Sequence, residues 1–137
     1  MTETVQKTEA SALLMAPASE VWALIGNFGA LAQWHPWVPD CEVSADGAER
    51  VIRADGKVIA VERLLSSTPL SHTYTVAEGP LPMADYRATL GVTPTPVGCR
   101  VSYRGEFVVT DPTADVVSRL QRFFEVGFDA LAARFRT

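Results

Sequence analysis

The sequence predicts an α+β fold in which a curved antiparallel sheet of six to seven strands surrounds a long C-terminal helix. Over residues 111–135, apolar side chains recur at three- and four-residue spacing, which is typical of an amphipathic helix. Between residues 41 and 109 the hydrophobic pattern changes to a period of two, which is typical of strands. The connections between these strands are short, and short connections make neighbouring strands antiparallel.

The N-terminal part predicts one strand that follows a loose segment. Residues 1–7 are polar, so we expect a flexible N-terminus before a single domain that covers residues 8–137. The largely apolar run at residues 8–15 predicts a short first strand. A chain of 137 residues is long enough for one domain with a substantial hydrophobic core.

Two short helices are expected after this strand. The first opens at Pro17, since proline suits the start of a helix, and ends at Gly26. The second covers residues 28–34 and is followed by Pro36 and Pro39, which cannot continue a helix.

Six further strands are then divided by turn residues. The pairs Asp46-Gly47 and Asp55-Gly56 are strong hairpin signals. A sheet of this size twists and curls, and the curvature separates it from the helix at one end, so we expect an internal cavity. The strands are predicted at residues 41–45, 48–54, 57–66, 71–77, 84–93 and 99–109.

The predicted C-terminal helix has about six turns at 3.6 residues per turn. Asp111 supplies a side-chain cap, and Pro112 a ring that is pre-set for the first turn. Gly127 lies among phenylalanines, where glycine costs about 1 kcal/mol relative to alanine. It indicates either a close contact between helix and sheet or space left for a ligand. The apolar face consists of Val116, Leu120, Phe123, Phe124, Gly127, Phe128, Leu131 and Phe135.

Composition excludes several classes of partner. The net charge is −4 and no basic run occurs, which argues against nucleic acid and anionic membranes. No apolar run approaches the roughly 20 residues that span a bilayer, so we expect no membrane insertion. Nothing resembles a signal peptide, and Cys41 and Cys99 follow no metal or redox spacing. A cytoplasmic protein with two reduced thiols is expected, as a monomer or a homodimer.

Several segments of the chain match a known family pattern in the same order. They are Pro-Ala-Ser-Glu-Val-Trp at 17–22, Trp-His-Pro at 34–36, Glu-Arg-Leu at 62–64 and Glu-Gly-Pro-Leu-Pro at 78–82, followed by Tyr86. In these residues and in its closing helix, the chain resembles the START/Bet v-like (SRPBCC) superfamily, and within it the bacterial polyketide cyclase/dehydrase-like group. The resemblance implies a helix-grip fold with an internal cavity for a hydrophobic ligand. It also implies two mouth loops, which contain Gly56 and Pro80, Leu81 and Pro82.

Strand alternation then predicts which side chains face this cavity. On each of the last strands, the apolar set that includes a tyrosine should point inward, together with the apolar face of the helix. Near the mouth, Trp37 could stack on a ligand. The predicted ligand-binding residues are Trp37, Tyr74, Val76, Ala88, Tyr103, Gly105, Phe107, Phe124, Gly127, Phe128 and Leu131.

The orientation of Glu62 is open in the pattern, because both faces of its strand are apolar enough to be buried. The resemblance implies that this glutamate lines the pocket, as in related plant hormone receptors. There, burial would raise its pKa and hydrogen bonds from Tyr74, Tyr86 or Tyr103 would lower it, which suits a general base. The alternative is a surface glutamate paired with Arg53 or Arg63.

The two histidines lead to different expectations. His35 is next to the expected opening and could move a proton or hold a ligand carboxylate. Its alternative role is to hydrogen-bond the backbone and fix the loop. We expect His72, at the start of a strand, to be solvated.

Two further residues qualify the resemblance. Pro39 stands where the plant receptors have a pocket lysine, which puts carriage of an acidic ligand in the same pose in doubt. Cys41 is expected to be a buried small hydrophobe, because no base accompanies it in sequence.

The sequence leaves two functions open. In the first, Glu62 removes a proton beside a carbonyl, and Tyr86 or His35 stabilises the oxyanion. This is cofactor-free cyclisation, dehydration or isomerisation of a polyketide-like or aromatic intermediate. In the second, the protein carries or senses a hydrophobic or lipid ligand without chemistry. No metal site is expected, because a single histidine near the pocket does not make a three-ligand zinc site.

Overall fold

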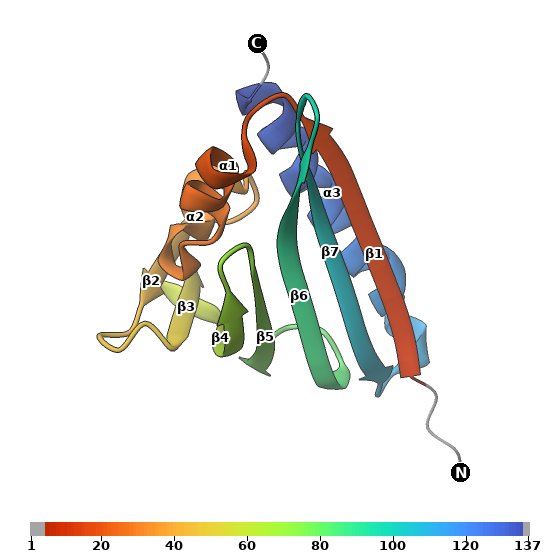
Figure 1. Ribbon diagram of the computed structural model, residues 1–137. Coiled ribbons are helices and arrows are strands. Elements are labelled where there is room, and N and C mark those ends of the chain that lie inside the picture. Colours follow the sequence, from red (N-terminus) through yellow and green to blue (C-terminus); the bar gives the residue numbers. More distant parts are fainter. Residues whose placement is uncertain (1–4, 136–137) are drawn as a thin grey trace.

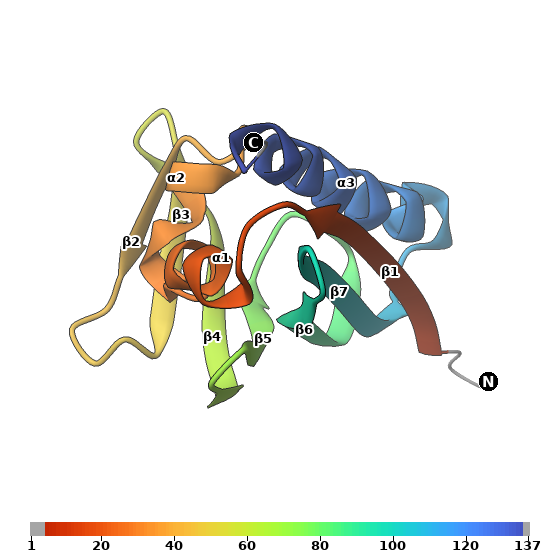
Figure 2. The ribbon, with the colours of Figure 1, turned by 45° about the horizontal axis from the view of Figure 1, so that its top comes forward.

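The computed structural model describes residues 5–135 and confirms the predicted α+β helix-grip architecture (Figure 1). Within this part of the chain, seven strands form one antiparallel sheet in the order β1-β7-β6-β5-β4-β3-β2. The long helix α3 (Val116–Arg134) runs along one face of the sheet (Figure 2). The strands are β1 (Val5–Leu14), β2 (Asp40–Val43), β3 (Glu49–Ala54), β4 (Lys57–Thr68), β5 (Ser71–Glu78), β6 (Met83–Thr95) and β7 (Gly98–Val109).

The two predicted short helices lie near the C-terminal end of α3 (Figures 1 and 2). The first is α1 (Ala18–Ile25), and the second consists of a 3-10 turn η1 (Phe28–Ala30) that continues into α2 (Leu31–Trp34). Asn27 caps η1, because its side chain accepts a hydrogen bond from the backbone N–H of Gly29 at 3.1 Å. These helices close one end of the space between the sheet and α3.

The N-terminal strand begins earlier than predicted. Residues 5–7 belong to β1 rather than to a flexible terminus, since Val5 pairs with Val108 and Lys7 with Glu106 of β7. Backbone pairing with β7 orders this segment although Gln6 and Lys7 are polar and Val5 is exposed, and the pattern did not reveal that partner. The rest of the predicted flexible segment, residues 1–4, lies outside the described residues.

The start of the long helix also differs from the prediction. Asp111 does cap a turn, with its carboxylate accepting from Thr113 N at 3.0 Å, but this turn is the separate 3-10 helix η2 (Pro112–Ala114). Asp115 then adopts the left-handed conformation, with φ of 53°, and α3 begins at Val116. The capping signal was genuine, but it belongs to a one-turn element that aspartate terminates.

Irregular pairing bends the sheet around α3. The register of β3 and β4 shifts between Ile52 and Arg53, and that of β6 and β7 shifts between Ala84 and Arg87. Asp85, inside the second irregularity, has φ of 55°. Such bulges increase local twist and redirect side chains. The curvature leaves room between the sheet and the N-terminal half of α3.

Candidate ligand-binding cavity

A cavity of about 420 Å³ lies between the N-terminal half of α3 and strands β3 to β6. This volume is within the range of roughly 300–1,000 Å³ that is usual for small-molecule sites. The β5–β6 loop and the segment that follows α2 contribute its remaining walls. The predicted residues that line it are Glu62 and Tyr86, then Trp37, Tyr74, Val76 and Phe124, and in the mouth loop Pro80 and Leu81.

The other predicted ligand-binding residues lie outside this cavity, because the sheet and α3 are in direct contact where they sit. Tyr103 stacks on Phe124 with ring centroids 3.4 Å apart. At Gly105 an added Cβ would lie 2.1 Å from the Tyr103 hydroxyl, so that ring already fills the space. Alternation therefore predicted the inward face correctly but not the depth of the opening. The residues concerned are Ala88, Tyr103, Gly105, Phe107, Gly127, Phe128 and Leu131.

Gly127 serves a close contact and leaves no room for a ligand. A Cβ at this position would lie 2.7 Å from Cδ2 of His35 and 3.0 Å from the ring of Trp34. The contact expected for Gly127 exists, but its partner is the end of α2 rather than the sheet. The glycine lets α2 and the following loop approach α3 closely.

One predicted mouth loop is not at the mouth. Gly56, with φ of 77°, forms an exposed hairpin turn with Asp55 and does not border the cavity. In the other loop Gly79 lines the cavity but Pro82 does not. The Pro82 carbonyl instead accepts a hydrogen bond from Thr110 N at 2.9 Å, which fastens the loop to the end of β7.

Glu62 points into the fold, and its partner is a residue that the sequence did not single out. Nε and Nη2 of Arg50 each approach Glu62 Oε1 at 2.6 Å. The surface partners considered for Glu62 are occupied elsewhere: Arg53 pairs with Glu42 and Arg63 with Glu49. Within the described residues, no tyrosine donates to this carboxylate, and Oε2 has no hydrogen-bond donor from the protein.

Arg50 is held firmly from several sides. It is only 4% exposed, and its Nη1 donates to the Phe28 carbonyl oxygen at 3.1 Å. Its guanidinium carbon lies 4.1 Å from the centre of the Phe28 ring and 4.8 Å from that of Tyr74. Burial alone would lower the pKa of Arg50, but the Glu62 carboxylate reverses this and raises it. The pair brings little net charge to the cavity wall.

The tyrosines form a second polar group beside this pair. The hydroxyls of Tyr86 and Tyr103 share a hydrogen bond of 2.6 Å, and the ring of Tyr86 stacks on that of Tyr74. Burial raises the pKa of Tyr74 and Tyr86 well above the usual 10. Both hydroxyls therefore keep their protons near neutral pH, so they are able to donate hydrogen bonds and do not serve as bases.

His35 fixes a loop and does not line the cavity. It is 1% exposed; its Nε2 donates to the Phe123 carbonyl oxygen at 2.7 Å, and its Nδ1 accepts from Trp37 N at 3.1 Å. Burial lowers the pKa of His35, which the hydrogen bond to Phe123 only partly opposes. With both ring nitrogens occupied by backbone groups, the geometry favours the positioning role over proton transfer.

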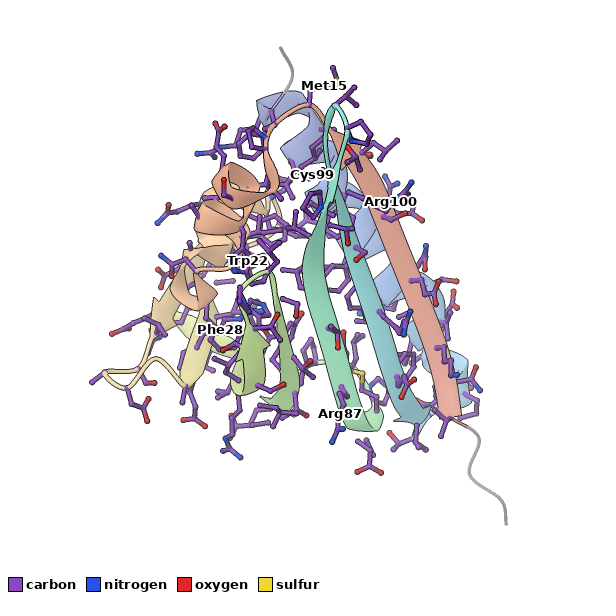
Figure 3. All side chains as sticks on the ribbon, viewed as in Figure 1. Met15, Trp22, Phe28, Arg87, Cys99 and Arg100 are labelled. Atoms are coloured by element: carbon purple, nitrogen blue, oxygen red, sulfur yellow. The ribbon has the colours of Figure 1, made fainter. Side chains whose placement is uncertain are left out.

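His72 is buried, contrary to the expectation that it is solvated. It is 3% exposed and packs against the rings of Trp22, Phe28 and Tyr74. Helix α1 and turn η1 cover the start of β5, which the strand pattern did not indicate; Figure 3 labels Trp22 and Phe28. Burial and the nearby Arg50 lower the pKa of His72 to about 4.

The remaining groups offer little reactive chemistry. Cys41 is half-buried, and burial raises the pKa of its thiol. Among residues 5–135, no three of the His, Cys, Asp and Glu side chains come together as metal ligands. No helix in the same residues is long and apolar enough to cross a membrane.

The family model described as "Polyketide cyclase / dehydrase and lipid transport" matches residues 5–136. The chain belongs to this family. Among curated proteins, none is similar enough in sequence to count as a match. The resemblance stated from the motifs is therefore confirmed at the level of the family.

Solved structures agree on the fold. A protein from Thermobifida fusca is 30% identical over 94% of this chain and 92% of its own, with a TM-score of 0.83. Norcoclaurine synthase from Thalictrum flavum, in complex with dopamine and hydroxybenzaldehyde, is 17% identical over 96% and 87%, with a TM-score of 0.73. The di-domain ARO/CYC StfQ of the steffimycin biosynthetic pathway is 14% identical over 96% and 50%, with a TM-score of 0.71.

Proposed function

We propose that this family member binds a small hydrophobic, oxygenated molecule in the cavity between α3 and the sheet. The observation that carries the proposal is the cavity of about 420 Å³, with walls from apolar side chains and a few convergent polar groups. Apolar walls supply affinity, while a few fixed polar groups set the orientation of a guest.

The inner polar groups define what the guest should offer. Oε2 of Glu62 accepts hydrogen bonds only, so it favours a hydroxyl or amine donor on the guest. Tyr86 lines the same space, and its hydroxyl is free to donate to a guest oxygen when Tyr103 donates to it. A molecule that carries both a donor and an acceptor at one end would satisfy both groups.

Catalysis is the second candidate function. Glu62 and Tyr86 both line the cavity, and two structural neighbours are a norcoclaurine synthase and an ARO/CYC protein by name. Cofactor-free cyclisation, dehydration or isomerisation would need Glu62 to accept a proton. However, the guanidinium of Arg50 lies 2.6 Å from Oε1 of Glu62 and occupies that oxygen, which leaves only Oε2 to take a proton from a substrate. The geometry supports binding better than proton abstraction.

Titration with N-phenyl-1-naphthylamine, a neutral apolar dye, tests the binding proposal. Ala60 lines the cavity, so Ala60→Phe should fill it and weaken dye binding at least tenfold. Val58 lies on the same strand, is 50% exposed and does not line the cavity, so Val58→Phe is the matched control. Equal dye affinity in the wild type and Ala60→Phe would refute binding at this site.

A natural guest is sought by native mass spectrometry of the freshly purified protein. A mass above that of the polypeptide, absent in Ala60→Phe, would identify the class of ligand. The identified ligand then separates the two functions: Glu62→Gln should keep binding it in either case, but should abolish turnover only if Glu62 is the base. Unchanged turnover by Glu62→Gln would remove Glu62 from the mechanism.

A further inference from the structure

The opening of the cavity carries two cations from α3. Arg119 and Arg122 are one helical turn apart, so they project from the same side of the helix. Both are exposed to solvent, and both also line the cavity. They therefore stand where an apolar interior meets water.

Neither cation is neutralised by the protein. Within residues 5–135, neither guanidinium lies within ion-pair distance of a carboxylate. Glu62 is the one acidic side chain that lines the cavity in this part of the chain, and Arg50 already balances it. The cavity mouth is thus locally positive in a chain whose net charge is −4.

The other side of the opening is apolar. Trp37 is 53% exposed there, and Pro80 and Leu81 of the β5–β6 loop complete the wall. A guest that lies in the cavity would pass apolar side chains on one side and guanidinium groups on the other. Guanidinium groups bind carboxylates, sulfonates and phosphates by paired, charge-assisted hydrogen bonds.

We propose that the guest of this cavity is an amphipathic anion, whose apolar body lies against β3 to β6 while its acidic group is bound by Arg119 and Arg122. This inference rests on the proposed binding function and adds the charge of the ligand. The acid group is held at the mouth, and the neutral Arg50–Glu62 pair stays beside the buried part.

Two dyes with the same ring skeleton test the inference. One is 8-anilino-1-naphthalenesulfonate, and the other is N-phenyl-1-naphthylamine, which lacks the sulfonate. The double variant Arg119→Gln/Arg122→Gln should lower the affinity for the sulfonate dye by about 5- to 20-fold, as expected for the loss of two solvent-exposed ion pairs. It should change the affinity for the neutral dye by less than twofold. In 0.5 M NaCl the sulfonate dye should lose affinity for the wild type but not for this variant, because salt screens exposed charges.

A matched control removes the same charge elsewhere. Arg87 and Arg100 are exposed on the outer face of the sheet and do not line the cavity; Figure 3 labels both. Arg87→Gln/Arg100→Gln should leave both dye affinities within twofold of the wild type. An equal loss of sulfonate binding in the control would assign the effect to net charge and overturn the inference.

The outcomes separate this inference from the proposed function. If both dyes bind the wild type and Arg119→Gln/Arg122→Gln alike, the anion site is refuted and the cavity remains a binding site. If the neutral dye binds the wild type and Ala60→Phe equally, the proposed function itself fails. Displacement of the neutral dye by decanoate, decyl phosphate and decanol identifies the acid group. Displacement by decanol as effective as by both anions would overturn the inference.

Discussion

The same helix, α3, borders both ends of the space between itself and the sheet. One end is filled by side chains, and the other is open. At the closed end, the C-terminal half of α3 packs against the end of α2 and the sheet, and Leu131 and Phe128 are almost fully buried. At the cavity end, Leu120, Phe123 and Phe124 border an open volume. Both halves present large apolar side chains, so the composition of α3 does not explain the difference. The elements that lie opposite each half of α3 determine whether the space is filled.

The short helices α1 and α2 lie at the closed end and not at the cavity end. Figures 1 and 2 show α1 and α2 near the C-terminal end of α3, and the contact of Gly127 with His35 brings that end together. At the other end, within residues 5–135, the bulged sheet curves away from α3 and no further helix fills the space between them. A hollow therefore arises from incomplete coverage of a curved sheet.

The largest change in stability is expected at the border of the two ends, where Arg50 supports the cavity wall. Arg50→Met would leave Glu62 charged and without its partner, so we expect a loss of about 3–5 kcal/mol in the free energy of unfolding. Replacing both residues, in Arg50→Met/Glu62→Leu, should recover most of that loss. Urea denaturation measures both, and a single variant as stable as the wild type would show that the pair is not coupled.

The next largest change in stability is expected from His72 at the closed end, and it depends on pH. The pKa of His72 is lowered to about 4, so between pH 6.5 and 4 the unfolded chain binds more protons than the folded one. Stability should therefore fall as pH falls through this window, by about 2 kcal/mol between pH 7 and 5, since each pKa unit is worth roughly 1.4 kcal/mol. His72→Phe should flatten this dependence. A variant with the same pH dependence as the wild type in urea denaturation would contradict the assignment.

Gly127 distinguishes the two ends directly. Gly127→Ala should lower stability by about 1–2 kcal/mol, because the new Cβ would meet a histidine ring fixed by two hydrogen bonds. On an exposed helix surface the same change would stabilise by roughly 1 kcal/mol. Affinity for the neutral dye should stay within twofold, since Gly127 does not border the cavity. A large loss of dye affinity would show that the ends are not independent.

The smallest effect is expected where the two ends meet at the tyrosine pair. Tyr103→Phe removes one hydroxyl of the 2.6 Å hydrogen bond and should cost about 1 kcal/mol of unfolding free energy. Tyr86→Phe and the double variant complete a cycle that isolates the pair. Additive losses in thermal or urea denaturation would indicate that the two hydroxyls do not interact.

Glu62 illustrates which features of the site the sequence pattern predicts and which it does not. The Asp55-Gly56 hairpin was expected from sequence, and a regular two-residue turn would place Val61 opposite Arg50. The irregularity between Ile52 and Arg53 shifts the register, so that Glu62 is the residue opposite Arg50. A single bulge, which the residue types did not predict, therefore determines that Arg50 is the partner of Glu62. The surface pair Arg63–Glu49, which also joins β3 and β4, is consistent with the same shift.

The sequence by itself determined the order of elements, the antiparallel sheet, the apolar face of α3 and the inward set on β6 and β7. These follow from periodicity and turn chemistry, which are local properties of the chain. Only the tertiary structure decided where the hollow ends, that His72 is buried under α1, and that Arg50 pairs with Glu62. These depend on contacts between segments far apart in sequence, and strand alternation gives the side that a residue faces but not the distance to what lies opposite.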